Sequence, residues 1–414
     1  MSRTAQRREF RTYLQKQREL TMLQGRLAAR EEAEEAPIDF TKYQGRPTAY
    51  FHEILGTRTM WDALDDFIRG IHEPPYKILV KSGHRIGKSF SAAGLINYWF
   101  DCFNPSVVIT LGSSAESMRD GVWSEVRSQR ARAGLPQCFV GPKTPELWTG
   151  PDHWAKSFSV KKGESFHGKH RQNMLFLFDE TTAVERPMFT IARSMFKPEP
   201  GNAWICFYNP TDPSTPVYGE EQSGEWRTFS FSSLDHPNVK KQLEHRRAGK
   251  GELISSQLPI PNAVSLSQVD GWVKEWTQEL DPSMLDEKGV PKSAIATDFQ
   301  WLDANGRTTW RRPMMDWEAR VLGNWLTHAT SSVWSDHLFT FCEKAIAPAP
   351  VHELPEIGCD VARFGDDRTA VHTRYVCLSL HHESRQGLRV TEVAGWLIEV
   401  ARQLADMVNQ LRTA

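Results

Sequence analysis

The chain has 414 residues, 40% of them hydrophobic and 24% charged, which is long enough for about two to three domains and excludes wholesale disorder. Fifty Lys and Arg against 51 Asp and Glu give a net charge of -1, which argues against a protein that coats nucleic acid by bulk charge but permits a local basic groove. No stretch approaches the roughly 20 apolar residues of a membrane span, and the N-terminus lacks the apolar core of a secretory signal, so we expect a protein that is neither transmembrane nor secreted. The six cysteines form no CxxC pair, so we expect no disulfide framework and no structural zinc, in keeping with a reducing cytoplasm.

Residues 1–36 form a segment of distinct charge. Up to Arg30 it has eight Lys and Arg against two Glu, and four of the next five residues are Glu. With few Gly or Pro, the segment predicts a charged helical arm. Two interpretations remain open: a helix whose charges are solvated, or an arm that contacts DNA or a partner subunit.

Residues 37–245 alternate short apolar runs with helical patterns. The runs are continuous and rich in β-branched or aromatic residues, as in strands buried on both faces, and lie at 77–81, 106–111, 174–178 and 203–208. Helical patterns lie between them at 89–103 and 115–133. This alternation predicts an α/β domain with a mainly parallel sheet.

The segment Ser82–Ser89, SGHRIGKS, follows the first apolar run and precedes a helical pattern. That context is typical of a phosphate-binding loop, whose backbone N–H groups converge on phosphate oxygens. We expect Lys88 to contact the β- and γ-phosphates and the Ser89 hydroxyl to bind Mg²⁺. Ser82 takes the place of the usual first glycine, and Gly83 follows it. The alternative is a chance Gly-Lys-Ser in a loop.

The segment Asn173–Glu180, NMLFLFDE, ends an apolar run with two acids. At the carboxyl end of a parallel strand, Asp179 is placed to hold Mg²⁺ and Glu180 to polarise an attacking water as general base. Alone, such a pair is more often a helix cap or a solvated turn. Together with the phosphate loop it indicates ATP hydrolysis.

Residues 246–350 predict a small, mostly helical connector in which the many tryptophans pack, followed by a Pro-rich hinge at 345–355. Residues 351–414 predict a strand at 356–362, a Gly-Asp-Asp turn, a strand at 369–376, a third strand near 388–393 and a final helix. The expected domains are therefore 1–36, 37–245, 246–350 and 351–414.

Several further segments share one order along the chain. They are VVITLGSSAESMRDGVWSEVR at 107–127, Phe166–His170, Asn209-Pro210, the His-Pro-Asn-Val of 236–239 and GCDVARFGDDRT at 358–369. With the two ATPase motifs, this ordered set resembles the large terminase subunit of tailed bacteriophages, an ATP-driven motor that packages DNA and cuts it.

The resemblance implies a RecA/ASCE-like P-loop ATPase, a connector and a ribonuclease-H-like nuclease domain. It implies that Ser82, Gly83, Gly87 and Lys88 bind the phosphates, that Ser89 and Asp179 bind Mg²⁺, and that Glu180 is the catalytic base. Asn209 ends the strand that couples the γ-phosphate state to movement, and Arg85 is placed to touch the γ-phosphate, unless it pairs with a helix acid at the surface. The stretch 58–62 lacks the glutamine that the family often uses for adenine.

For the nuclease, the resemblance implies Asp360 as a catalytic metal ligand and Asp367 as a further ligand, with Mg²⁺ or Mn²⁺ as the metal. Asp360 lies in an apolar run, where an uncompensated charge is costly. Turn chemistry is an equal interpretation of Asp366 and Asp367. None of Glu383, Glu392, Glu399 and Asp406 fits the family's later acidic motif. We therefore expect an incomplete nuclease domain in a chain truncated within it.

The implied partners are double-stranded DNA, a small terminase subunit and the portal ring, with self-assembly into a ring on the portal in the bacterial host's cytoplasm. The implied activity is a DNA-stimulated ATPase. The basic cluster Lys161, Lys162, Lys169, His170 and Arg171 is a candidate DNA contact, with solvated surface charge as the alternative. Two other functions remain open: a helicase-like nucleic-acid-dependent ATPase, and a prophage remnant that binds ATP or DNA without cleaving.

Overall fold

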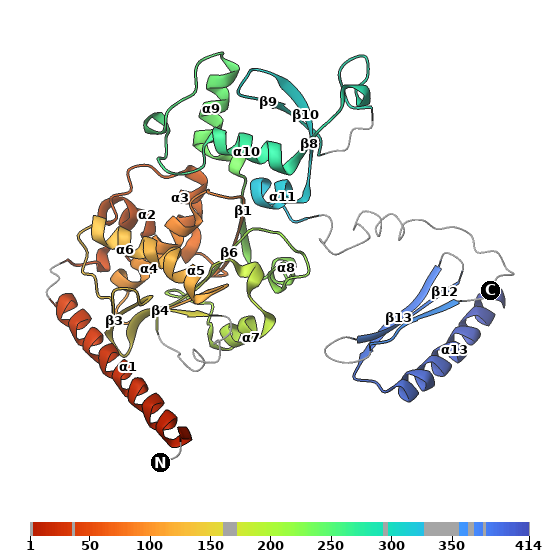
Figure 1. The fold of residues 1–414 in the computed structure, drawn as a ribbon, viewed down its shortest axis with the longest axis horizontal. Coiled ribbons are helices and arrows are strands. Elements are labelled where there is room, and N and C mark those ends of the chain that lie inside the picture. Colours follow the sequence, from red (N-terminus) through yellow and green to blue (C-terminus); the bar gives the residue numbers. More distant parts are fainter. Residues whose placement is uncertain are drawn as a thin grey trace. The chain divides into compact units, whose positions relative to one another are not determined.

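The computed structural model describes residues 3–34, 38–159, 172–292, 297–326, 356–362, 368–375 and 378–413. The chain forms two compact units, Met1–Val333 and Trp334–Ala414, and each is described by itself (Figure 1). The division of the first unit near residue 245 and the boundary at residue 350 remain predictions.

The first unit is built on a seven-stranded sheet. Its order is β3-β4-β2-β5-β6-β1-β7, and every neighbouring pair is parallel except β3 and β4. The strands are β1 Lys77–Ser82, β2 Val107–Gly112, β3 Glu146–Gly150, β4 His153–Ser159, β5 Met174–Phe178, β6 Ala203–Tyr208 and β7 Arg227–Phe231. The four predicted strands and the α/β class are confirmed. The strands at the two ends of the sheet, β3, β4 and β7, were not predicted.

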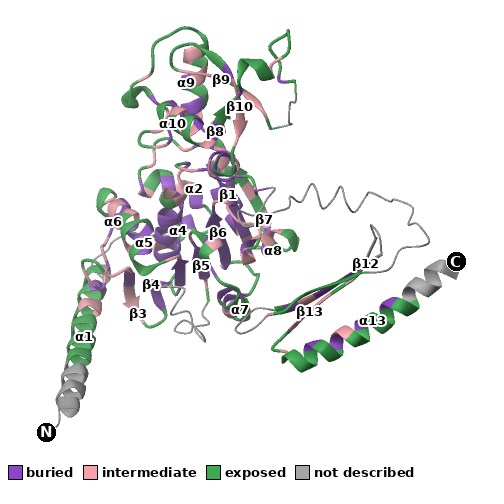
Figure 2. Ribbon diagram, turned by 45° about the vertical axis from the view of Figure 1, so that its right-hand side comes forward, coloured by how far each residue is buried: buried purple, intermediate pink, exposed green. Residues whose placement is uncertain are grey.

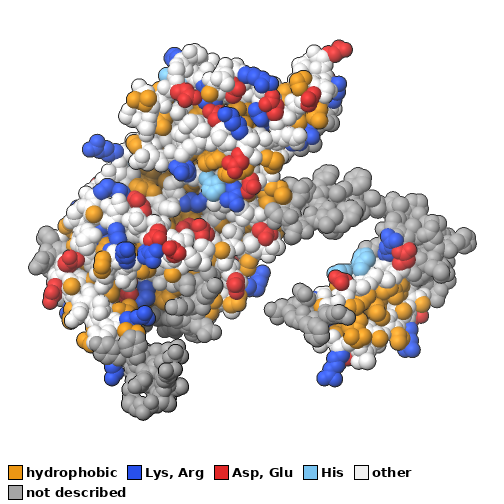
Figure 3. All heavy atoms as spheres, in the orientation of Figure 1, with side chains coloured by type: hydrophobic (Ala, Val, Ile, Leu, Met, Phe, Trp, Pro, Cys, Tyr) orange, Lys and Arg blue, Asp and Glu red, His pale blue; other side chains and the backbone are white. Residues whose placement is uncertain are grey.

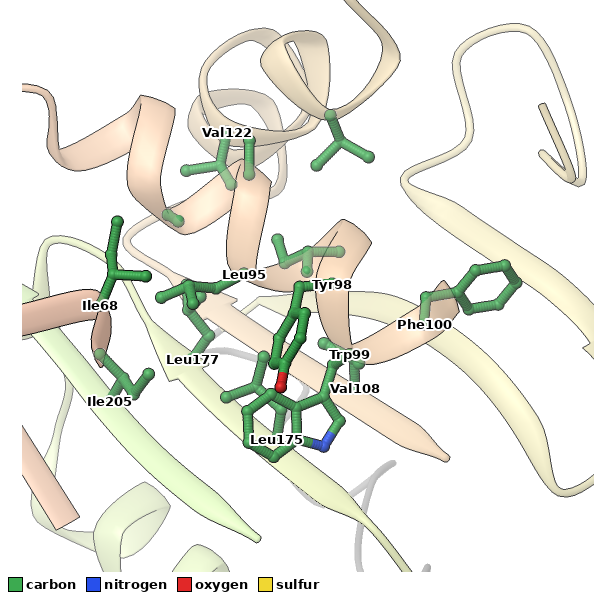
Figure 4. Packing of buried hydrophobic residues seen from close by; sticks show 14 of the residues in the cluster. Ile68, Leu95, Tyr98, Trp99, Phe100, Val108, Val122, Leu175, Leu177 and Ile205 are labelled. Carbon is green, nitrogen blue, oxygen red and sulfur yellow. The ribbon is translucent and has the colours of Figure 1, made fainter. Parts of the chain in front are cut away.

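Helices cover both faces of this sheet, which explains why its central strands are mostly apolar. On β1, Ile78 and Val80 belong to one buried cluster and Leu79 to another, as the alternation of a strand requires. The first cluster includes side chains of α3 Asp62–Arg69, α4 Lys88–Cys102 and α6 Val122–Arg132, and Figure 4 shows part of it. The second includes side chains of α7 Arg186–Met195 and α8 Pro216–Gln222. The purple central strands in Figure 2 are the result.

The predicted helix at 115–133 is two helices, α5 Ala115–Asp120 and α6. Gly121 separates them with φ -90 and ψ -102, outside the helical region. The Trp of this segment has a structural role, because Trp123 Nε1 donates to Thr110 Oγ1 on β2 at 3.0 Å.

The N-terminal segment forms the predicted helix, α1 Arg3–Glu34, and its C-terminal part packs on the sheet edge (Figure 1). Ala29 is buried, Arg26 pairs with the buried Glu146 at 3.1 Å, and Glu32 accepts a hydrogen bond from the Cys138 amide at 3.1 Å. Leu20, Leu23 and Leu27 are exposed. The arm is therefore partly docked, and not merely a solvated helix.

The segment after residue 237 combines helices with a second sheet. Its helices are α9 Pro237–Arg247, α10 Leu266–Trp276 and α11 Met315–Trp317, and the strands β8 Thr277–Glu279, β10 Thr308–Pro313 and β9 Phe299–Leu302 pair antiparallel in that order. The predicted connector thus contains a sheet besides its helices. The predicted packing of tryptophans is confirmed for Trp301 and Trp317, which are buried in a common cluster.

In the second unit, β11 Glu356–Asp360, β12 Arg368–Tyr375 and β13 Leu378–Gln386 form an antiparallel sheet with β12 in the centre. Helix α13 Val390–Thr413 follows, and its Trp396 and Val400 cluster with Val371 of β12. The strand predicted near 388–393 is wrong: the third strand ends at Gln386, and its polar sequence concealed it. The four cysteines of the described residues, Cys102, Cys138, Cys206 and Cys359, are free.

Candidate nucleotide site

Lys88 is the centre of the candidate site. Its ammonium group donates to Ser82 Oγ at 3.0 Å, to the Gly83 carbonyl at 3.0 Å and to Asn209 Oδ1 at 3.1 Å. Gly87 caps the start of α4 with φ 99, a conformation that strongly favours glycine, and it turns the chain so that Lys88 begins the helix. The structure therefore brings together the ends of β1 and β6 around one cation.

The loop before Lys88 offers backbone amides to an anion. The amides of Gly83 and His84 donate to the carbonyls of Phe231 and Arg320, at 2.9 and 2.6 Å. Within the described part of the chain, the amides of residues 85–88 donate to no backbone carbonyl. Free N–H groups at the N-terminus of the 15-residue helix α4, with the positive end of its dipole, suit a phosphate.

The contacts of Ser82 and Gly83 explain why this loop has a serine in place of the usual first glycine and a glycine directly after it. Ser82 is buried, and its hydroxyl both accepts from Lys88 and donates to the Gly83 carbonyl at 3.1 Å. A Cβ on Gly83 would lie 2.3 Å from Ser233 Oγ and 2.4 Å from the Val321 carbonyl oxygen. A glycine is thus needed at position 83, one residue after the usual first glycine of such a loop, because Ser233 and Val321 pack closely against the backbone there.

The acidic pair directly follows β5, and in the sheet β6 lies between β5 and β1, the strand that precedes the phosphate loop. The Asp179 amide continues the ladder to Leu111 of β2 at 2.8 Å, and Glu180 turns out of it with φ 50. The Ser113 hydroxyl donates to Glu180 Oε2. Two consecutive acids at a strand end consequently take different directions.

Burial and mutual charge perturb the site's ionisable groups. Burial raises the pKa of Asp179 to about 6, against the opposite effect of Lys88. Burial also lowers the pKa of Lys88 to about 8, against the opposite effects of Asp179 and Glu180. Both charged forms are destabilised by desolvation, so a phosphate near Lys88 and a cation near Asp179 would each favour them.

Two of the predicted residues have the type of donor that suits a magnesium ion. Mg²⁺ prefers oxygen ligands and usually takes only one or two from the protein, the others coming from phosphate and water. Asp179 and the exposed Ser89 hydroxyl, at the start of α4, are oxygen donors of this kind. No cluster of three His, Cys, Asp or Glu suited to a metal exists among the described residues.

Asn209 and Arg85 occupy different environments. Asn209 donates to the Ser82 carbonyl at 2.5 Å while it accepts from Lys88, so it connects the ends of β6 and β1. Arg85 has φ 57 and an exposed side chain, and it makes no ion pair with any described residue. Pairing with a helix acid, the alternative considered for Arg85, is not seen in this part of the chain.

The residues that contact the phosphate loop from distant parts of the chain were not predicted from the sequence. His84 lies near the stacked rings of Trp272 and Trp276, at 6.1 and 6.0 Å between centroids, and its ring contacts Arg320 at 3.4 Å. Burial, together with nearby cations, lowers the pKa of His84 to about 4. No local signal links positions so far apart. Ser113, by contrast, comes two residues after the run 106–111 that was predicted as a strand.

The His-Pro-Asn-Val segment of residues 236–239, one of the segments that resemble the terminase family, has a structural role in this fold. His236 Nδ1 accepts from the Asn238 amide at 3.2 Å and caps α9, with Pro237 in its first turn. Asn238 then binds the carbonyls of Ile260 and Val264 at 2.7 and 3.1 Å. This motif therefore orders the start of α9 and fixes it to the segment of residues 260–264.

Of the predicted nuclease ligands Asp360 and Asp367, the structure describes Asp360. Asp360 is the last residue of β11 and is exposed, so the burial cost that singled it out is absent. The reason is that every residue of β11, an edge strand, is exposed. Asp366 and Asp367 lie outside the described residues, as do Phe166–His170 and the basic cluster of residues 161, 162 and 169–171.

The helices that the structure describes include none with the length and apolar character to cross a bilayer. The described surface of the first unit mixes basic and acidic side chains on the face shown in Figure 3, in keeping with the balanced charge of the sequence.

Comparison with solved structures finds phage large terminases. The Thermus phage P74-26 large terminase ATPase domain is similar with a TM-score of 0.37 and 11% identity, over 49% of this chain and 93% of that one. The HK97 bacteriophage large terminase is similar with a TM-score of 0.45 and 14% identity, over 80% and 64%. The large terminase of a thermophilic bacteriophage, in complex with ADP, is similar with a TM-score of 0.33 and 12% identity, over 88% and 74%. No family model and no curated protein matches.

Proposed function

We propose that this chain is an ATPase that drives double-stranded DNA into a viral capsid. The observation that carries the ATPase proposal is the position of Lys88, held by Ser82, Gly83 and Asn209. It lies close enough to Asp179 and Glu180 for their charges to affect its pKa. A cation and free amides at the end of β1, with two acids at the end of β5, are what hydrolysis of a nucleoside triphosphate requires.

In this proposal the free amides of residues 85–88 and Lys88 bind the β- and γ-phosphates, and Arg85 contacts the γ-phosphate. Ser89 and Asp179 hold Mg²⁺, which supplies positive charge to the phosphates when bound. Glu180 orients a water and takes its proton as the oxygen attacks the γ-phosphorus. The bond to the β–γ bridging oxygen breaks, and ADP leaves with its electron pair.

The motor function is supported by the order of the sequence motifs and by how the connector meets the loop. The His84 amide donates to the Arg320 carbonyl, and Val321 packs against Gly83. A change in the loop on hydrolysis would therefore move the segment of residues 320–323. We propose double-stranded DNA, a small terminase subunit and a portal ring as partners, with ring assembly on the portal in the host cytoplasm.

DNA-stimulated ATPase activity tests the proposal. We expect Lys88→Ala and Glu180→Gln to lower the DNA-stimulated rate by about 100-fold or more, since each removes a group that acts in the transition state. Circular dichroism and melting temperature would confirm that both variants fold. Turnover that is unchanged in both variants would refute the proposed site.

For the nuclease, we propose that the segment GCDVARFGDDRT, with Asp360 and Asp367 as ligands of Mg²⁺ or Mn²⁺, forms part of a metal site that is incomplete in this chain. Because Asp360 is exposed on an edge strand, we expect manganese-dependent nicking of plasmid DNA by this chain to be very weak or absent. Robust nicking that is lost in Asp360→Ala would contradict this expectation.

A further inference from the structure

We propose that Ser113 is a positioning residue for the general base Glu180, an inference that rests on the proposed ATPase function. Its hydroxyl donates to Glu180 Oε2. Ser113 lies outside the phosphate loop and outside the acidic motif, and it makes this contact from a different strand end.

The sheet places the two residues opposite each other. Strands β2 and β5 are parallel neighbours, with Leu111 in register with Phe178. The Asp179 amide extends the ladder to the Leu111 carbonyl at 2.8 Å. Two residues further along each strand, Ser113 and Glu180 therefore meet at the same edge of the sheet.

The backbone on the serine side is held in place. A Cβ on Gly112 would lie 2.4 Å from Met118 Sδ, so the residue before Ser113 is packed against α5. The residue after it, Ser114, caps α5 by accepting from the Ser117 amide at 3.0 Å. Ser113 thus lies between two restrained neighbours.

The backbone on the glutamate side is held as well. Glu180 has φ 50, and the buried Thr181 hydroxyl donates to the carbonyls of Phe178 and Phe207 at 3.1 and 3.0 Å. The Glu180 side chain itself is exposed and makes no ion pair with any described residue. A flexible carboxylate on a fixed backbone needs a hydrogen bond to keep one orientation.

In this arrangement the two carboxylate oxygens of Glu180 have different roles. Oε2 accepts from Ser113, and Oε1 remains available to accept the hydrogen bond, and then the proton, of the attacking water. Loss of the serine hydroxyl would release the carboxylate to many rotamers. The chemical step would then slow, while binding of the phosphates by Lys88 and the loop amides would not change.

Steady-state ATPase kinetics on the full chain with Ser113→Thr and Ser113→Val test this inference. Threonine keeps the hydroxyl and valine has nearly the same shape without it. We expect Ser113→Val to lower kcat about 10-fold with KM for ATP within about twofold of the parent chain, and Ser113→Thr to retain at least about half of kcat. Ser114→Ala is the local control: it removes the cap of α5 and should lower the melting temperature without lowering kcat.

Three outcomes would overturn the inference. In the first, Ser113→Val has the parent kcat while Glu180→Gln is inactive, which leaves the ATPase proposal standing and removes only the role of Ser113. In the second, Ser113→Thr and Ser114→Ala lose as much kcat as Ser113→Val, which indicates a general disturbance of the β2–α5 junction. In the third, Glu180→Gln and Lys88→Ala remain active, which refutes the proposed function together with this inference.

Discussion

Two aspartates of this chain follow similar apolar runs and meet opposite surroundings. Asp179 continues β5, a central strand flanked by β2 and β6, and burial raises its pKa to about 6. Asp360 ends β11, an edge strand of a three-stranded sheet, and is exposed. An acid at the end of an apolar run is therefore destabilised in its charged form only when neighbouring strands and covering helices exclude water from it.

The same contrast extends to the contacts around each acid. Near Asp179, the side chains of Ser82, Lys88 and Asn209 form a connected network of hydrogen bonds. Near Asp360, the Ala362 amide donates to Thr369 Oγ1 at 3.2 Å, and the strand pairs on one side with β12. The first region therefore surrounds its acid with fixed polar partners, whereas the second leaves its acid in water.

The largest expected effect compares the two acids directly. Asp179→Ala should lower DNA-stimulated ATPase activity by about 100-fold, because it removes the proposed Mg²⁺ ligand and the charge that supports Lys88. Asp360→Ala should leave that activity unchanged. Steady-state ATP turnover with both variants measures the comparison, and equal effects would remove the distinction.

A second comparison uses a glycine from each region. Gly83→Ala should lower the free energy of unfolding by about 2 kcal/mol, because the new methyl group would lie 2.3 Å from Ser233 Oγ and 2.4 Å from the Val321 carbonyl oxygen. Gly358→Ala should cost little, since the nearest atom to its Cβ is the His372 carbonyl oxygen at 3.9 Å. Calorimetric unfolding of the two variants measures this, and a similar loss in both would show that the loop has room to relax.

The smallest expected effect concerns pH. Burial lowers the pKa of His236 to about 4 from 6.5, so the unfolded chain binds the proton more tightly than the folded one. The stabilising contribution is complete above pH 6.5 and is lost as the pH falls toward 4, which amounts to about 1 kcal/mol between pH 7.5 and 5.5.

His236→Asn should reduce this pH dependence while keeping the cap of α9, since asparagine is also a good N-cap residue. Urea unfolding at the two pH values measures the change. A variant with the same pH dependence as the parent chain would show that His236 does not contribute.

Much of the first unit could be predicted from sequence because its signals are local. Continuous apolar runs identified β1, β2, β5 and β6, since strands buried on both faces cannot alternate with polar residues. Strands β9 and β10 were not predicted, because short strands with mixed Trp and Arg content show no clear period. The strand β13 was missed for the same reason, its sequence LSLHHESRQ being mostly polar.

Within the candidate site, too, the residues with local sequence signals were predicted and those that depend on distant contacts were not. Lys88, Asp179 and Glu180 were predicted because a strand end and a following helix mark their places. Arg320 carries no such mark, and Ser113, although it also lies between a strand and a helix, belongs to neither ATPase motif. They contact the site through the pairing of β2 with β5 and the return of the connector to the loop, and both depend on contacts between distant segments.

The class of the fold and the types of side chain at its strand ends follow from the sequence, because hydrophobic periodicity and the Gly-Lys-Ser loop are properties of consecutive residues. Which of the acids is desolvated, and which polar side chains hold the proposed catalytic ones, depends on the tertiary structure. Burial and orientation are set by neighbours in space, and a local pattern does not contain them.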